Sequence, residues 1–273
     1  MMRFPLVLTL LSCAYLLVGC GGADTPANET TKPPTGSTPP SATELLKDNL
    51  AIPDNRNSLP LNVLFFGNSH SSPLLRQSLQ TLLQTGRDNN ANTAGGVGLA
   101  YLDERWADSS NLALLHSQRW THLVLQAQKY SQSGQVDYST VAAQLWVASA
   151  KRRAVTPVLY PEHPQRGNTL EGMFLYRLHQ SIAKAQSACV APIGPVWDAV
   201  LQQHPEISLH HDDGNHFNAT GALLTAYVMY EVITGNPADA LPDIANLNIA
   251  NSTQQILRQA ASAGLQQYPA CAF

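Results

Sequence analysis

Between residues 59 and 273, short apolar runs alternate with longer segments in which apolar residues recur at helical spacing. Runs that predict strands cover residues 62–66, a segment ending near 93, and residues 122–125, 155–160 and 189–193. Helical spacing covers residues 74–84, 141–150, 174–185, 196–201, 222–233 and 256–265. Repeated strand, crossover helix and strand predict a mostly parallel sheet covered on both faces. We therefore expect one α/β domain in three α/β/α layers, whose ligand site lies at the carboxyl ends of the strands.

The first sixty residues have a different pattern and predict two further segments. Arg3, an apolar run over residues 4–18 and a final Gly19-Cys20 follow the order of an export signal. Residues 17–20 resemble the lipobox of bacterial lipoproteins, which implies a signal peptide over residues 1–19 and a lipid on Cys20. An ordinary secretory signal or an uncleaved anchor is the alternative. Residues 20–58 are rich in Thr, Pro, Ser and Asn, which predicts a flexible tether before a domain over residues 59–273.

The composition and charge of the chain predict a globular domain and limit the kinds of molecule that it can bind. Of 273 residues, 44% are hydrophobic and 13% are charged, which suits one globular domain with a sizeable core. The formal net charge is −3, and the largest basic cluster is the triplet at residues 151–153. Because a phosphate backbone requires a larger basic surface, we exclude nucleic acid as a partner.

Two of the four cysteines belong to the expected folded domain. Cys13 lies in the expected signal and Cys20 in the lipobox, so Cys189 and Cys271 remain in a domain outside the cytoplasm. One disulfide pairing is then possible, and it would fasten the C-terminal tail to the strand near Cys189. Two unpaired buried thiols are the alternative.

A serine follows the first predicted strand directly. Residues 63–71 are VLFFGNSHS, so an apolar strand stops at a glycine and Ser69 lies on the turn into a helix. A serine hydroxyl is unreactive at its own pKa and needs a base within hydrogen-bond reach to act as a nucleophile. The alternative is that Ser69 or Ser71 caps the helix that follows.

A candidate base lies near the C-terminus, where residues 211–217 are HDDGNHF. Asp213 and His216 are three residues apart, so both side chains can lie on one side of a tight turn. The carboxylate could then fix the tautomer of the imidazole and stabilise the imidazolium that forms when the ring takes the serine proton. A solvated polar loop and a metal site remain alternatives, because His210, His211 and Asp212 are also possible ligands. We expect no metal, since adjacent histidines point apart more easily than together.

A strand-ending Gly-x-Ser near the start and an Asp-x-x-His near the end resemble the first and last blocks of the SGNH (GDSL-like) hydrolase superfamily. The resemblance covers roughly residues 62–235 and implies a flavodoxin-like sheet of about five strands. It also implies a serine esterase that acts without a cofactor, with Ser69 as nucleophile, His216 as base and Asp213 as its partner. The chain departs from the usual pattern at Asn68, where Asp is common, and at Gln128, where Asn is common.

The same resemblance implies an oxyanion hole with three donors. They are the N–H of Ser69, the N–H of a glycine after the second strand and an amide side chain after the third. Gly96 is the expected glycine, although Gly95 and Gly98 also fit the pattern. Gln128 is the expected amide, and Gln126 would lie on the same face and support the site if the strand continues.

The implied reaction is hydrolysis of carboxylic esters, and an envelope location favours short acyl groups, such as O-acetyl, on glycans. Asn68, His70, Tyr130 and His163 are expected to contact the substrate, and the polar stretch at residues 162–168 is expected to rim the site.

Gly21 implies, by the habit of lipoproteins, the outer membrane of a Gram-negative cell. The lipid would be the only membrane contact of a monomer. The alternative is a weakly active or inactive protein of this fold that binds an envelope glycan or partner.

Overall fold

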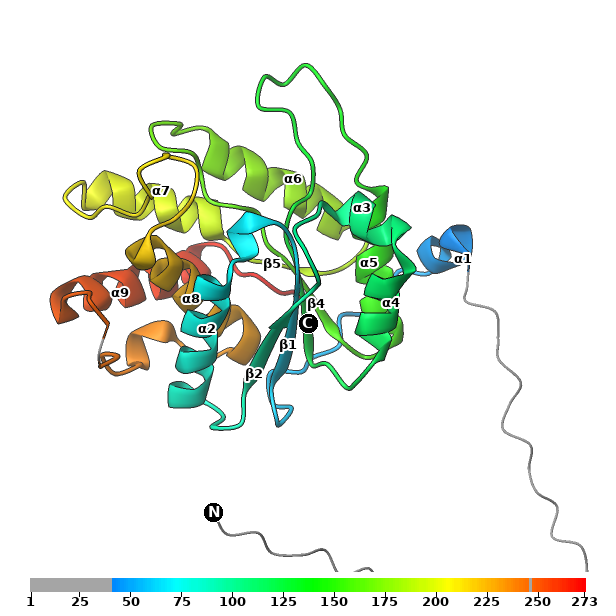
Figure 1. Cartoon of the computed structure of the whole chain (residues 1–273), viewed down its shortest axis with the longest axis horizontal. Coiled ribbons are helices and arrows are strands. Elements are labelled where there is room, and N and C mark those ends of the chain that lie inside the picture. Colours follow the sequence, from blue (N-terminus) through cyan, green and yellow to red (C-terminus); the bar gives the residue numbers. More distant parts are fainter. Residues whose placement is uncertain (1–40, 246) are drawn as a thin grey trace, which may run out of the picture. The chain divides into compact units, whose positions relative to one another are not determined.

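The computed structural model describes residues 41–245 and 247–273, and Figure 1 shows their arrangement. The expected export signal, the lipidation site Cys20 and the tether up to residue 40 lie outside the described residues. Within the described part of the chain, no helix combines the length and the hydropathy that a membrane span requires.

Five parallel strands form one sheet in the order β2-β1-β3-β4-β5. The strands are β1 (Asn62–Phe66), β2 (Asn92–Gly95), β3 (His122–Leu125), β4 (Thr156–Leu159) and β5 (Cys189–Val190). In the central register, Val63 lies opposite His122 and Asn62 lies opposite Asn92. This is the strand order of flavodoxin-like sheets, so the predicted fold class is confirmed.

Side chains from successive strand residues point to opposite faces of the sheet and divide the core in two. Val63 and Phe65 pack on one face, and Leu64 and Phe66 pack on the other. The first face is covered by α2 (Pro73–Gly86), α7 (Ile193–Gln203), α8 (Ala219–Thr234) and α9 (Asn251–Gln267). The second is covered by α3 (Leu102–Ala107), α4 (Ser109–His116), α5 (Val141–Arg152) and α6 (Glu171–Ala185). Figure 1 shows α2, α8 and α9 on one side of the strands and α3, α4 and α5 on the other.

All six predicted helices are present, each extended by one to five residues at one or both ends, but α3 and α4 were not predicted. They are six and eight residues long, and each buries only one aliphatic side chain, Leu102 and Leu115 respectively. Two residues at unrelated positions give no helical period in the sequence, because a period needs several apolar residues on one face. The short helices η1 (Ser69–Ser71) and η2 (Ala238–Ala240) were missed for the same reason.

Helices α2 and α8 begin directly after the two turns that carry the predicted site residues. The Ser72 hydroxyl caps α2 by accepting the N–H of Leu75, and Pro73 occupies the first helical position. The Asn218 side chain caps α8 by accepting the N–H groups of Thr220 and Gly221. Because α2 and α8 pack against each other, they bring the two turns to the same edge of the sheet.

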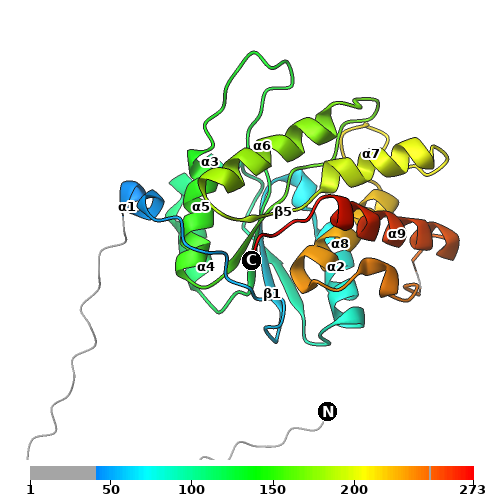
Figure 2. The same cartoon turned by 180° about the vertical axis from the view of Figure 1, so that it is seen from behind.

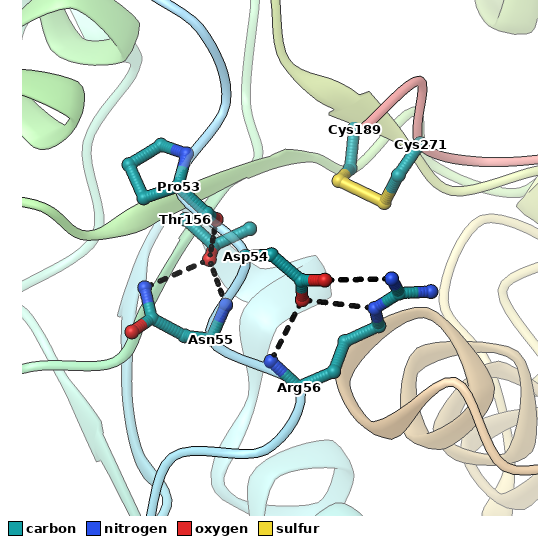
Figure 3. The surroundings of a disulfide bond; sticks show 7 residues. All are labelled: Pro53, Asp54, Asn55, Arg56, Thr156, Cys189 and Cys271. Atoms are coloured by element: carbon teal, nitrogen blue, oxygen red, sulfur yellow. Dashed lines mark hydrogen bonds and ion pairs between the residues drawn. A yellow bond between two sulfur atoms is a disulfide. The ribbon is translucent and has the colours of Figure 1, made fainter.

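Residues 42–58 pack against the domain, so the tether expected over residues 20–58 is shorter at its C-terminal end. Helix α1 (Ala42–Lys47) buries Leu45 against α5. The Asn55 side chain donates to the Ala154 carbonyl at 2.8 Å and to the Thr156 hydroxyl at 3.0 Å. Figure 3 shows the second bond, together with the Thr156 hydroxyl donating to the carbonyl of Pro53. Buried Leu45 and specific side-chain bonds thus fix a segment whose average composition predicted flexibility.

The C-terminal tail is fastened beside β5, at one edge of the sheet. Cys189 and Cys271 form a disulfide, as predicted, across a sequence separation of 82 residues (Figure 3). Next to it the Val190 N–H donates to the Ala270 carbonyl at 2.8 Å. Figure 2 shows the tail running from α9 past β5. The tail therefore covers part of the edge that β5 would otherwise expose.

Replacing Cys189 and Cys271 together by Ala should lower the free energy of unfolding by about 4 kcal/mol, since the bridge closes a long loop in the unfolded chain. Urea unfolding of the oxidised protein and of the double variant, followed by circular dichroism, measures the difference. A loss under about 1 kcal/mol would show that packing and the Val190 hydrogen bond hold the tail without help from the bridge.

Candidate active site

The nucleophile candidate lies on a tight turn at the end of β1. Asn68 caps the short helix η1 by accepting the N–H of His70 with its side-chain oxygen at 3.1 Å. The Ser71 hydroxyl is buried and donates to the Asn68 carbonyl at 2.9 Å. Ser72, rather than Ser69 or Ser71, caps the following helix α2. The capping alternative is therefore wrong for Ser69, whose hydroxyl is directed to another partner.

The second turn, at residues 211–216, is closed by an antiparallel bridge between His210 and Phe217. One oxygen of Asp213 accepts the backbone N–H groups of Asn215 and His216, both at 2.9 Å. Its other oxygen lies 2.7 Å from Nδ1 of His216. The backbone N–H and then the ring of His216 are the largest causes that hold the pKa of Asp213 well below its ordinary value. Asp213 is therefore a carboxylate at neutral pH.

His216 joins the two turns. Its Nε2 atom lies 2.8 Å from Oγ of Ser69, within the range expected for a nucleophile and its base. With Asp213 on Nδ1, the ring carries its proton on that nitrogen and leaves Nε2 to accept from the serine. The structure thus brings together the three residues predicted as the catalytic set.

A cavity of about 950 Å³ opens beside Ser69 and His216 at the carboxyl ends of the strands. Four residues expected to contact the substrate or the oxyanion line it: Asn68, His70, Gln128 and Tyr130. Residues 129–138, in the long loop between β3 and α5 in Figure 1, form much of one wall. Tyr101, Tyr138, Glu162 and Gln165 also line the cavity. The last two belong to the polar stretch that was expected to rim the site.

Two predicted substrate contacts have other partners. His163 is 2% exposed, stacks on Trp197 with ring centroids 4.1 Å apart, and lies outside the residues that line the cavity. Its Nε2 atom lies 3.0 Å from the Asn215 carbonyl, so it supports the second turn from behind. His70 borders the cavity but stacks on His216, with ring centroids 5.0 Å apart. Burial lowers the pKa of His70 to about 4, which keeps this neighbour of His216 neutral.

The assignment of Gly96 to the oxyanion hole is wrong. Its N–H donates to the Phe65 carbonyl at 2.8 Å and extends the pairing of β2 with β1, so it is not free to bind an oxyanion. A Cβ at this position would lie 2.6 Å from the guanidinium of Arg105, so the glycine makes room for that side chain. Gly95 and Gly98 do not line the cavity either. From this segment, only Tyr101 reaches it.

The hydrogen bonds of Gln128 conflict with its assignment to the oxyanion hole. Its side-chain nitrogen donates to the carbonyls of Lys129 at 2.8 Å and Ser139 at 3.1 Å, so both of its hydrogens are used. The expected shared face with Gln126 is absent, because β3 ends at Leu125 and Ala127 has a left-handed φ of 73°. The side-chain oxygen of Gln126 instead accepts the N–H of Asn68, directly before Ser69, at 2.8 Å.

The residues of the metal alternative are bonded to other groups. Nε2 of His210 lies 2.8 Å from the Pro164 carbonyl, while His216 pairs with Asp213 and Ser69. Over residues 41–245 and 247–273, no three His, Cys, Asp or Glu side chains are grouped so as to hold a metal ion.

Comparison with known proteins supports the fold. No protein-family model and no curated protein matches the sequence. A DUF4886 family protein from Bacteroides uniformis superposes with a TM-score of 0.66 at 15% identity, over 77% of this chain and 95% of that one. A protein from Slackia heliotrinireducens, provisionally assigned to the SGNH hydrolases, gives a TM-score of 0.50 at 21% identity, over 63% of this chain and 97% of that one. The likeness shows that this chain shares the α/β fold of these two proteins.

Replacing Glu162 by Gln should flatten the pH dependence of stability. Burial raises the pKa of the Glu162 carboxyl from 4.5 to about 7, so the folded protein binds this proton more tightly than the unfolded chain does. The contribution of this proton to the free energy of unfolding is fully present below pH 4.5 and is lost as the pH rises through about 7. The melting temperature of the wild type should therefore fall more steeply over this range than that of the variant. Glu206→Gln, at an exposed carboxylate, is the control; equal slopes for wild type and Glu162→Gln would contradict the expectation.

Proposed function

We propose that this protein is a serine esterase that hydrolyses short acyl esters, such as O-acetyl groups, on hydroxyl-rich alcohols of the cell envelope. The observation that carries the proposal is the unbroken hydrogen-bond series from Ser69 through His216 to Asp213. The series ends at a hydroxyl that faces a cavity large enough for a small ligand.

The geometry supports acyl transfer to water in two steps. Ser69 Oγ attacks the acyl carbonyl carbon while Nε2 of His216 takes the hydroxyl proton, and Asp213 stabilises the imidazolium. Collapse of the tetrahedral intermediate breaks the ester C–O bond, and His216 returns the proton to the departing alcohol. Water then attacks the acyl-enzyme by the same route and releases the carboxylic acid. The reaction balances with water alone, and we propose no cofactor.

Of the three oxyanion donors that the resemblance implies, we keep the Ser69 N–H and replace the Gly96 N–H, which is bonded to the Phe65 carbonyl. Within the described residues, the N–H of Ser69 and the side-chain nitrogen of Asn68 have no acceptor, and both residues line the cavity. Because the Asn68 oxygen accepts from His70, its nitrogen is left available for a ligand. We propose these two groups as donors to the developing oxyanion, with Gln128 contributing only if it leaves its two carbonyls.

The cavity favours a short acyl group and a polar alcohol. Serine, glutamine and asparagine make up half of the residues that line it, and three tyrosines, Tyr101, Tyr130 and Tyr138, add aromatic surface with polar ends. A long acyl chain would need a continuous apolar wall to leave water. The envelope location and the lipid anchor depend on residues 1–20 and remain part of this proposal.

The purified protein should hydrolyse p-nitrophenyl acetate faster than the butyrate, and the butyrate faster than the octanoate. Ser69→Ala and His216→Ala should abolish turnover, and Asp213→Asn should lower kcat by about 10⁴-fold because the imidazole loses its tautomer. His211→Ala is a matched control, since this exposed histidine lies on the same turn with its Nδ1 3.6 Å from Asp213.

A wild type with no turnover and no labelling by a fluorophosphonate would contradict the esterase. A protein that binds an envelope glycan without turning it over would then become the better interpretation. Loss of activity in His211→Ala together with activity in His216→Ala would contradict the assigned base.

A further inference from the structure

The peptide unit between Gly67 and Asn68, directly before Ser69, is held at both of its polar groups by buried side chains. The Gly67 carbonyl accepts Nη2 of Arg105 at 2.6 Å, and the Asn68 N–H donates to Oε1 of Gln126 at 2.8 Å. Arg105 is 2% exposed and Gln126 is fully buried. This peptide lies beyond the end of β1, and its one other partner among the described residues is the Ala100 N–H, 3.4 Å from the Gly67 carbonyl. The bonds from Arg105 and to Gln126 are the shorter ones.

The hydrogen bond from Asn68 fixes the orientation of the Gln126 amide. A backbone N–H can only donate, so the oxygen of Gln126 must face Asn68 and its nitrogen must face away. That nitrogen donates to Oε2 of Glu162 at 2.9 Å. Position 162 therefore has to offer an acceptor, and a carboxylate is the strongest one available.

Above the Glu162 pKa of about 7, the bonds run in one direction from a cation to an anion. The Arg105 guanidinium donates to the peptide carbonyl, the peptide N–H donates to the Gln126 oxygen, and the Gln126 nitrogen donates to the Glu162 carboxylate. Both amide dipoles are thus aligned between the two charges, and each bond polarises the next. Loss of either charge would weaken every bond in the series.

Neighbouring glycines and carbonyls complete this arrangement. A Cβ at Gly67 would collide with the Gln126 oxygen, and a Cβ at Gly96 would collide with Arg105. The guanidinium also donates to the carbonyls of Val97 at 3.2 Å and Gly98 at 2.9 Å. One buried side chain therefore holds the nucleophile turn and the loop after β2 in a fixed relation.

We propose that Arg105, Gln126 and Glu162 are positioning residues, which set the Ser69 hydroxyl through a polarised hydrogen-bond series that crosses the Gly67–Asn68 peptide. The proposal rests on the proposed function, because it assigns these residues to the turnover that Ser69 performs. None of the three touches the reacting atoms, so their removal should lower kcat. KM should stay nearly unchanged when Arg105 or Gln126 is replaced, because neither lines the cavity, whereas Glu162 does.

An exchange of the amide and the carboxyl tests the series. In Gln126→Glu, the carboxyls at positions 126 and 162 would face each other where an amide now donates at 2.9 Å, so they could not both ionise. We expect kcat to fall about 10- to 100-fold as the nucleophile turn shifts, and to fall more at about pH 8, where the pair begins to lose the proton that it shares, than at about pH 5.5. In Gln126→Glu/Glu162→Gln, the new carboxylate accepts from Asn68 and the new amide donates back to it. This double variant should recover kcat to within about threefold of the wild type.

Controls separate positioning from a general effect of charge or folding. Gln77→Glu adds the same charge on the exposed side of α2 and should leave kcat unchanged. Thermal unfolding shows whether each variant folds. If Gln126→Glu does not fold, Glu162→Leu and Glu162→Gln are compared instead. Glu162→Leu removes the acceptor and should lower kcat at least tenfold. Glu162→Gln keeps an oxygen acceptor and should lower kcat about threefold or less.

Wild-type kcat in Gln126→Glu, no recovery in a folded double variant, or equal kcat for Glu162→Leu and Glu162→Gln would each overturn the proposal. A wild type that neither hydrolyses esters nor reacts with a fluorophosphonate would instead overturn the proposed function. The series would then be judged by unfolding of the two single variants and the double variant. Additive losses of stability would show that positions 126 and 162 do not interact, and recovery in the double variant would show that they do.

Discussion

The hydrogen bond between Ser69 and His216 joins two turns that lie 147 residues apart in the sequence. One turn is a three-residue helix, and the other is a loop closed by a bridge between His210 and Phe217. The packing of α2 against α8 brings them together, since each helix begins within four residues of its turn. At the other end of the pair, the Tyr230 hydroxyl donates to the Gly86 carbonyl at 3.3 Å, which fixes the two helices along their length. The position of the Ser69 hydroxyl thus depends on core packing well away from it.

Polar groups beside the sheet impose a second constraint. Where β1 stops, its backbone must find partners outside the ladder, and those partners are buried side chains from α3 and from the end of β3. Burying Arg105 is costly unless its donors are satisfied, and here its two Nη groups meet three carbonyls and the Asn111 side chain, while its Nε has no partner among the described residues. One of these bonds, to the Gly67 carbonyl, holds the nucleophile turn. Stability of the fold and order at the site are therefore inseparable at this point.

The sequence predicted the features that depend on local patterns. Apolar runs located the strands, and the spacing of Asp213 and His216 located their pair, because a three-residue separation on one turn leaves little freedom. The oxyanion donors could not be predicted in this way. Whether the N–H of Gly96 is free depends on its register against Phe65, and the direction of Gln128 depends on the left-handed backbone at Ala127. Neither property has a signature in the residues themselves.

Arg105 gave no signal in the sequence, since it lies on a six-residue helix without a clear period. Gln126 and Glu162 did have one, because both follow strands whose carboxyl ends meet at the site. Their roles were still hidden, since the partners of Gln126, the Asn68 N–H and the Glu162 carboxylate, lie 58 and 36 residues away in the sequence. Sequence position can indicate which residues reach the site edge, while hydrogen-bond direction decides what they do there.

Charge pairing around the cavity bears on which alcohol could enter. Lys129 is paired with Asp103 at 2.8 Å and Glu104 at 3.2 Å, so the positive charge that it brings to the wall is matched by two carboxylates. On the opposite side, the Tyr130 hydroxyl donates to Glu171 at 2.8 Å, and burial and then the Glu162 charge raise the pKa of this phenol, which keeps it protonated. Two adjacent residues thus anchor the loop between β3 and α5 to α3 and to α6. With the cation matched and Glu162 facing the cavity, an anionic alcohol would meet repulsion, whereas a neutral polyhydroxyl alcohol would find the hydroxyls and amides it can bond.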